Sequence, residues 1–153
     1  MKKTLRLPVV FFLILALFQL VACGGKTVVS LEDFNLLMEE KGYVIKDATE
    51  QIALDTIRAI SLAINEDYQI EYYVFKDIGT AEAVFTQNKL LFEDNKTGGH
   101  IEQSRSYGNN SYYSLISGGN YYVLSRVDNT MIYVVADDDY KKEIADTIKE
   151  LGY

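Results

Sequence analysis

Tight-turn signals at a spacing of about ten residues place the strongest constraint on the second half of the chain. Small or polar pairs separate short runs that alternate in polarity or carry adjacent tyrosines, and they stand at Gly98-Gly99, Gly108-Asn109, Gly118-Gly119 and Asp128-Asn129. Such pairs adopt the turns that join antiparallel strands. The pattern therefore predicts a meander of strands over residues 100–107, 111–117, 120–128 and 130–136.

Helical periodicity marks further elements, because apolar residues recur three and four positions apart on one face. The predicted helices cover residues 31–41, 79–94 and 138–151. Ser30 and Asp77 precede the first two helices, and side chains of this kind accept hydrogen bonds from the free amides of a first helical turn. Gly42 and Gly152 follow the first and the third, where glycine suits the left-handed conformation that ends a helix.

The segment from residue 48 to residue 64 admits two interpretations. An apolar stripe at helical spacing competes there with the alternation of Ile60, Leu62 and Ile64, which is typical of a strand. We favour a strand over about residues 56–64, because a turn signal at residues 65–67 leads to a second strand-like run at 69–76. A short strand is also expected at residues 43–46.

Together these elements predict an α+β fold. We expect one domain, built as an antiparallel β-sheet of about five to seven strands with three helices on one side, in two layers. Removal of an N-terminal signal would leave about 130 residues, which is enough for one ordinary hydrophobic core. The chain holds one proline and no tryptophan, so it has no proline-rich linker between domains.

Residues 1–22 have the composition of a secretory signal peptide. Lys2, Lys3 and Arg6 form a basic start, and an apolar run extends from Val9 to Phe18. A run of that length is shorter than the roughly 20 residues that a helix needs to cross a bilayer, so cleavage is favoured over a permanent membrane span.

The stretch Leu20-Val21-Ala22-Cys23 resembles the lipobox of a bacterial lipoprotein precursor, and Cys23 is the only cysteine. The resemblance implies cleavage before Cys23 and a diacylglycerol thioether on its sulfur, which would anchor the chain to the extracytoplasmic face of the cell membrane. Residues 23–29 would then form a lipidated tether and residues 30–153 the globular domain. The runs YQIEYYVFKD and VLSRVDNTMIYV also resemble small uncharacterised lipoproteins of Gram-positive bacteria.

The charge of the chain is acidic. The net charge is −7 for the whole chain and about −10 without residues 1–22, which hold three basic residues and no acidic one. Nucleic acid would be repelled by such a surface, so we expect no nucleic-acid partner.

The residues that carry chemistry do not form a recognisable catalytic or metal-binding pattern. His100 is the single histidine and lies beside Gly98-Gly99, where a solvated loop position is expected. Among the carboxylates, Glu71, Glu82 and Asp139 cannot be singled out as an acid or a base. The run Asp137-Asp138-Asp139 is expected to start the last helix rather than to hold a metal, because it lacks the spacing of a calcium loop. We therefore expect no catalytic residue, no cofactor and no metal.

Tyrosine is the unusual residue, with 12 copies. Neighbours in a strand point to opposite faces, so each adjacent pair should place one ring in the core and one on the outer face. Rings on an uncovered sheet face would form a partner-binding platform. The simpler interpretation is that the tyrosines only cover a sheet face that is partly exposed to solvent. The candidate surface consists of the pairs Tyr72-Tyr73, Tyr112-Tyr113 and Tyr121-Tyr122.

Two functional classes follow from these features. The first is a non-catalytic binding or accessory protein that meets an envelope protein or a cell-wall component. The alternative is a single-lobed carrier of a small ligand, which would need a concave apolar pocket of about 300 Å³ or more.

Overall fold

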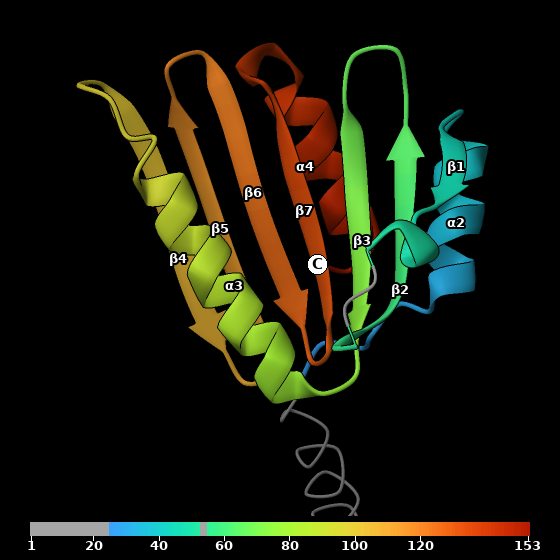
Figure 1. Cartoon of the computed structure of the whole chain (residues 1–153). Coiled ribbons are helices and arrows are strands. Elements are labelled where there is room, and N and C mark those ends of the chain that lie inside the picture. The colour runs from blue at the N-terminus through green and yellow to red at the C-terminus, as the bar shows by residue number, and fades with distance from the viewer. Residues whose placement is uncertain (1–24, 53–54) are drawn as a thin grey trace, which may run out of the picture.

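The computed structural model describes residues 25–52 and 55–153. Within them the chain forms one antiparallel sheet of seven strands in the order β1-β2-β3-β7-β6-β5-β4 (Figure 1). The strands are β1 (Val44–Asp47), β2 (Ile57–Ile64), β3 (Gln69–Phe75), β4 (His100–Tyr107), β5 (Asn110–Ser117), β6 (Asn120–Val127) and β7 (Thr130–Asp137). The helices are α2 (Leu31–Glu40), α3 (Ile78–Glu93) and α4 (Lys141–Glu150), with short 3₁₀ turns η2 (Thr49–Gln51) and η3 (Asp138–Tyr140). The predicted α+β class is confirmed.

The meander predicted from the turn signals is present as β4 to β7. Its turns use left-handed backbone where the sequence offers glycine or aspartate, with φ of 60° at Gly118, 81° at Gly119 and 49° at Asp128. Strand β7 then pairs with β3 as well as with β6, so the meander joins the β1–β3 half into one continuous sheet.

The strand interpretation of residues 56–64 is confirmed by β2. Residues 69–75 form its antiparallel partner β3, and Asn65 shapes the turn between them. The Asn65 side-chain oxygen accepts hydrogen bonds from the amides of Asp67 at 2.9 Å and Tyr68 at 2.8 Å. Between β1 and β2, η2 is the only helical element among the described residues, in place of the alternative helix.

The predicted capping residues begin two of the three helices, α2 and α3. The Ser30 hydroxyl accepts from the amide of Asp33 at 3.0 Å, and the Asp77 carboxylate accepts from the amide of Thr80 at 2.8 Å. The third helix begins later than expected. Asp137 caps the 3₁₀ turn η3 through the amide of Asp139 at 3.0 Å, so regular α-helix starts only at residue 141.

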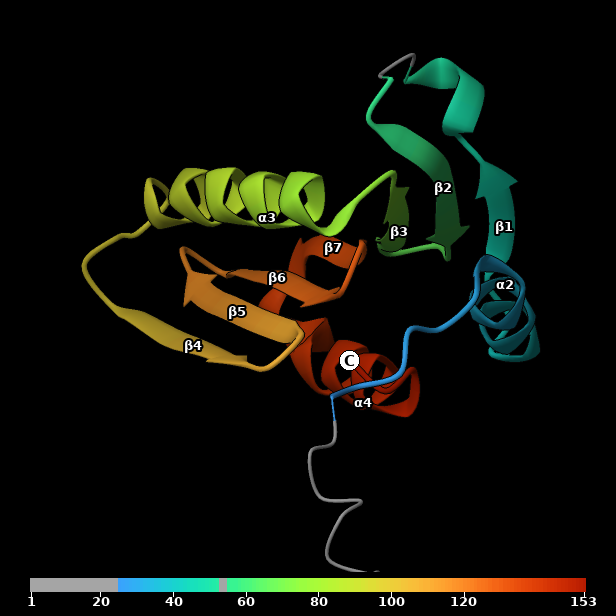
Figure 2. The ribbon, with the colours of Figure 1, turned by 90° about the horizontal axis from the view of Figure 1, so that it is seen from below.

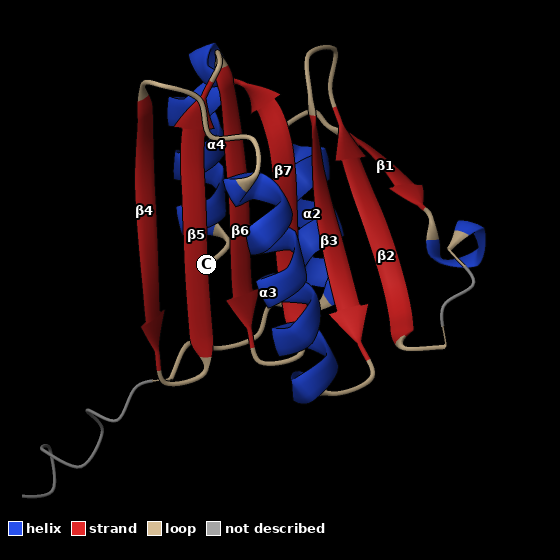
Figure 3. Cartoon of the chain, turned by 60° about the vertical axis from the view of Figure 1, so that its left-hand side comes forward, coloured by secondary structure: helices blue, strands red, loops and turns tan. Residues whose placement is uncertain are grey.

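The helices cover both faces of the sheet, which corrects the expected two-layer arrangement with all helices on one side. Helix α3 lies on one face, whereas α2 and α4 lie on the other (Figures 2 and 3). Each face has its own core, one with Phe34, Tyr72 and Ile148 and the other with Phe85 and Leu124. The central strands are apolar on both faces, so one layer of helices could not bury them.

The predicted signal peptide and the lipidation site Cys23 lie outside the described residues. Among the helices of residues 25–52 and 55–153, none has the length and apolar character that crossing a bilayer requires.

Candidate binding site

The α3 face of the sheet is only partly covered. Helix α3 packs against β3, β5, β6 and β7, and no α-helix of the described chain lies over β1 and β2 on this face (Figures 1 and 2). Two adjoining pockets lie on this part of the sheet, one of them against α3, and we call them together the trough.

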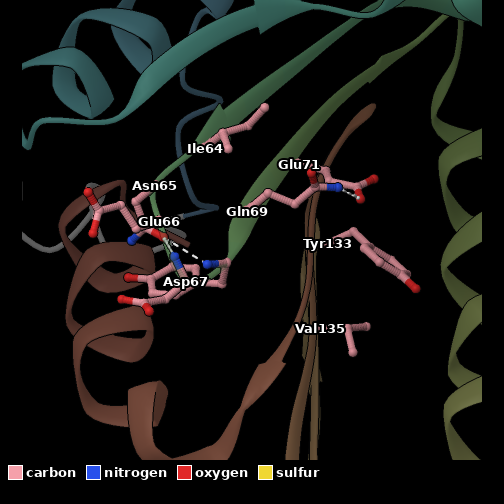
Figure 4. A pocket seen from close by; sticks show the side chains of 9 residues that line it. Ile64, Asn65, Glu66, Asp67, Gln69, Glu71, Tyr133 and Val135 are labelled. Carbon is pink, nitrogen blue, oxygen red and sulfur yellow. Dashed lines mark hydrogen bonds between the residues drawn. The ribbon is translucent and has the colours of Figure 1, made fainter.

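The first pocket, which we call the polar pocket, has a volume of about 590 Å³. It lies at the β2–β3 turn and along the neighbouring part of β7, where Gln69, Glu71, Tyr133 and Val135 share one side of the sheet (Figure 4). Its lining residues are Ile64, Asn65, Glu66, Asp67, Tyr68, Gln69, Glu71, Tyr133 and Val135.

The second pocket, the apolar pocket, has a volume of about 310 Å³ and lies between α3 and the start of β2. Tyr133 lines both pockets, so the two meet at this side chain. Most of the lining side chains are apolar or aromatic, and the set is Ile52, Thr56, Ile57, Tyr73, Phe75, Val84, Gln87, Asn88, Met131 and Tyr133.

Glu71 is the central charged group of the trough. It stands in register with Leu62 of β2 on one side and Tyr133 of β7 on the other, and it is half-buried. Its carboxylate accepts a hydrogen bond from the side-chain Nε2 of Gln69 at 2.7 Å and a short one from the Tyr73 hydroxyl. The carboxylate is thereby held in place without a cationic partner among the described residues.

The phenols of the trough are held in their neutral form. Burial raises the pKa of Tyr73, and the hydrogen bond and the negative charge of Glu71 raise it further. Burial likewise raises the pKa of Tyr133, with added contributions from the charges of Glu71 and Tyr122. Neutral tyrosines offer aromatic faces together with hydroxyl groups that donate and accept hydrogen bonds.

This set of side chains is suited to recognition. No serine, cysteine, histidine or lysine occurs among the described residues that line the trough. A carboxylate held by a tyrosine and a glutamine can accept hydrogen bonds from hydroxyl, amide or ammonium groups of a ligand. Aromatic rings beside it supply the apolar contact area that small binding sites usually contain.

Tyr68, which lines the polar pocket, belongs to a second tyrosine cluster. The Tyr68 hydroxyl donates to Glu143 of α4 at 2.7 Å and is hydrogen-bonded to the hydroxyl of Tyr43. Burial is the main reason that the pKa of Tyr68 is raised well above its usual value. These contacts fasten α4 to the β2–β3 turn, so this end of the trough rests on a rigid support.

The tyrosine pairs do not form the platform that the sequence suggested. One ring of each pair faces each side of the sheet, but helices cover both sides. Tyr72 and Tyr121 are buried on the α2 and α4 side with half-buried Tyr112 packed against them, whereas Tyr113 is buried and Tyr122 half-buried on the α3 side. Tyr73 is the only member of the pairs that lines the trough in the described structure.

The other polar residues considered from the sequence lie away from the trough. His100 is exposed at the start of strand β4, where its Nδ1 atom lies 3.2 Å from the carbonyl oxygen of Thr97. The carboxylates of Asp137, Asp138 and Asp139 lie within 4.8 Å of one another, and Asp137 serves as the cap of η3.

Sequence reasoning did not single out Glu71 or Tyr133 as binding residues. One signal was available for Glu71: a glutamate in the middle of the strand-like run QIEYYVF, two positions before Tyr73, must share a face with it. Tyr133 gave no such signal, because only the pairing of β7 with β3 brings it beside Glu71.

Comparison with known proteins adds little to this site. No family model and no curated protein matches the chain. Among solved structures, a GTP binding regulator from Thermotoga maritima superposes with a TM-score of 0.48 at 15% sequence identity, over 81% of this chain and 85% of that chain. A likeness at this level supports no conclusion about function.

Proposed function

We propose that the protein is a membrane-anchored extracytoplasmic lipoprotein with a non-catalytic binding or accessory role in the cell envelope, and that the trough is its binding surface. The observation that carries the binding role is the half-covered sheet face, where Glu71, Tyr73 and Tyr133 lie beside open volume. The anchor rests on the sequence, in which a signal-like segment ends at the single cysteine, Cys23.

Lipid attachment would determine where the domain works. A diacylglycerol group on Cys23 carries two acyl chains, which is enough for stable membrane attachment without a spanning helix. The domain would then stay at the extracytoplasmic face of the cell membrane, where its partners are envelope proteins or cell-wall components.

The binding role is tested by a matched pair of variants. Val135 lines the polar pocket and is 38% exposed, whereas Ile101 is 58% exposed on β4 and lies outside the trough. Val135→Glu and Ile101→Glu place the same new charge on an exposed strand position, one inside the proposed surface and one outside it. The assay is chemical cross-linking on intact cells that express the tagged lipoprotein, with mass spectrometry of the captured material and melting curves of both variants.

We expect one enriched partner that is lost with Val135→Glu and retained with Ile101→Glu. Equal capture by both variants would show that the trough is not the surface involved. Full retention of the protein on membranes after Cys23→Ser would refute the anchor.

The single-lobed carrier remains the second candidate, because the apolar pocket of about 310 Å³ reaches the lower size limit of ligand sites. A small molecule that raises the melting temperature of the wild type, but not of Val84→Trp, would favour the carrier. Val84 lines this pocket, and a larger side chain there would fill it.

A further inference from the structure

A side-chain clamp holds the N-terminal tether against one end of the sheet. The Asn109 side-chain oxygen accepts a hydrogen bond from the backbone amide of Lys26 at 2.9 Å, and its nitrogen donates to the Lys26 carbonyl at 2.8 Å. The same nitrogen donates to the Asp128 carboxylate at 2.9 Å, which links the clamp to the β6–β7 turn. A Cβ atom at Gly25 would lie 3.0 Å from the Asn109 oxygen, so glycine at this position allows the close approach.

The clamp limits how far an anchor on Cys23 could lie from the domain. Three peptide units join Cys23 to Lys26, and an extended chain covers at most about 3.5 Å per residue, so the reach is about 11 Å. The next fixed points of the tether are Val28, which is half-buried against the core, and Val29, whose carbonyl accepts from the Tyr72 hydroxyl. Without the clamp the reach from Cys23 would therefore increase to about 18–21 Å.

The clamp lies at a well-defined end of the sheet. The β4–β5 turn, the β6–β7 turn and the end of β3 are joined there, because Asp128 donates its amide to the Asn109 carbonyl and Asn129 bonds to Phe75. The opposite end carries the β5–β6 and β2–β3 turns. Strands β4 to β7 have eight residues each, which separates the two ends by about 26 Å.

The two ends differ in charge. The clamp end has the basic residues Lys26, Arg58, Lys76 and Arg105 together with the acidic residues Asp55, Asp77 and Asp128, and Asp33 and Glu150 line a pocket with Lys26. The opposite end has Lys141 and Lys142 against a larger acidic set, which consists of Glu66, Asp67, Asp137, Asp138, Asp139 and Glu143. In an acidic protein, the end that meets anionic lipid headgroups should be the less acidic one.

Two exposed side chains at the clamp end can contact a headgroup layer, although exposed apolar side chains such as Val44 and Ile101 also lie toward the opposite end. Tyr107, the last residue of β4, is 73% exposed beside the turn that carries Asn109. Ile78, the first residue of α3, is 47% exposed at the same end. Tyrosine and basic side chains are enriched where proteins contact the headgroup layer.

We infer that the clamp end is the membrane-facing end of the domain, and that Asn109 holds it against the phospholipid headgroups. The inference rests on the proposed lipidation of Cys23. Its consequence is that the trough runs away from the membrane, with the polar pocket at the far end, where the β2–β3 turn lies.

The test uses the lipidated full chain in vesicles of phosphatidylethanolamine and phosphatidylglycerol. A fluorophore is attached to Lys76→Cys at the clamp end or to Asn120→Cys at the opposite end, both at exposed positions. The acylated Cys23 cannot react with the label. Quenching by a lipid that carries its quencher in the headgroup is then compared between the two labels, in the wild-type background, with Asn109→Ala and with Asn129→Ala.

We expect the label at position 76 to be quenched several-fold more than the label at position 120. Asn109→Ala should bring the two values close together, because the longer tether lets the domain turn. Asn129→Ala is the matched control, since its side chain bonds to Phe75 in the neighbouring turn and not to the tether, and it should keep the difference. Melting curves of both variants show whether the domain remains folded.

The outcomes separate the orientation from the anchor. Equal quenching of the two labels on vesicle-bound wild type would overturn the orientation and leave the anchor standing. An unchanged difference in folded Asn109→Ala would overturn the role of Asn109 in holding that orientation. Failure of the wild type to float with vesicles, together with an unmodified mass for the N-terminal peptide, would overturn the proposed lipoprotein function itself.

Discussion

Tyr153 should contribute more to stability than any exposed tyrosine, although it lies beyond the last helix. Its side chain is only 4% exposed, and its ring meets that of Tyr72 edge to face with centroids 6.2 Å apart. Its hydroxyl lies within hydrogen-bond distance of the hydroxyls of Thr130 and Tyr72, the latter at 3.3 Å, and can donate to either one. The backbone amide of Tyr153 also bonds to the Ile148 carbonyl, which fixes the ring in the core.

Two substitutions separate the ring from its hydroxyl. Tyr153→Ala removes a buried aromatic ring and should lower the free energy of unfolding by about 3–5 kcal/mol. Tyr153→Phe keeps the ring and removes only the hydrogen bonds, at a cost of about 0.5–1.5 kcal/mol. Thr130 and Tyr72 still donate to the carbonyls of Val127 and Val29, so neither hydroxyl is left without an acceptor in the Phe variant.

Urea unfolding of the three proteins measures these differences. Because a domain of this size has a total stability of about 5–15 kcal/mol, Tyr153→Ala should shift the urea midpoint clearly. Tyr107→Ala is the control, since Tyr107 is 73% exposed and should change stability by about 0.5 kcal/mol or less. A loss below about 1 kcal/mol for Tyr153→Ala, or equal losses for the Ala and Phe variants, would refute the reasoning.

Three further predictions concern stability. The free energy of unfolding should fall as the pH rises above the usual tyrosine pKa of 10.0. Burial raises the pKa of Tyr73 and of other phenols in the folded protein, so the unfolded chain loses its phenol protons first. Equilibrium unfolding at pH 8 to 11 measures this, and a free energy that does not change with pH would contradict it. Tyr68→Phe should cost about 1.5–3 kcal/mol by removing the hydrogen bond to the Glu143 carboxylate, and an unchanged urea midpoint would contradict this. Asp128→Ala should lower the free energy of unfolding by about 1–3 kcal/mol, because Asp128 has φ 49° and its carboxylate accepts a hydrogen bond from Asn109. Asp128→Gly also loses this hydrogen bond but suits the positive φ, so it should lower the melting temperature less than Asp128→Ala does. The reverse order would argue against backbone strain at this position.

Secondary structure was predictable because its signals are local. Turn residues such as Gly118 and Asp128 mark the strand ends, and Ser30 and Asp77 cap helices through contacts within three residues of themselves. The start of α4 was wrong by three residues, because the turn that follows the Asp137 cap, residues 138–140, is the 3₁₀ helix η3 rather than α-helix.

The layers and the candidate site were not predictable in the same way. The alternation of side chains along a strand predicted that Tyr72 and Tyr73 point to opposite faces of the sheet. It could not predict that α3 would pack on one face and α2 and α4 on the other. That choice depends on the direction in which each connection leaves the sheet. The possible tyrosine platform, the alternative to the simpler interpretation, could not be judged from the sequence for the same reason. Helices cover both faces at the tyrosine pairs, and the open area lies beside β2 and β3 rather than over β5 and β6.

By itself, the sequence determined the order and the approximate bounds of the elements, the α+β class, and the acidic character of the chain. These follow from periodicity, turn chemistry and side-chain ionisation, which act over a few residues. Only the tertiary structure decided that β7 pairs with β3, so that Tyr133 meets Glu71 in the trough, and that Asn109 holds Lys26 across 83 positions of chain. Contacts of this kind join residues far apart in sequence, and they depend on how the whole sheet packs against its helices.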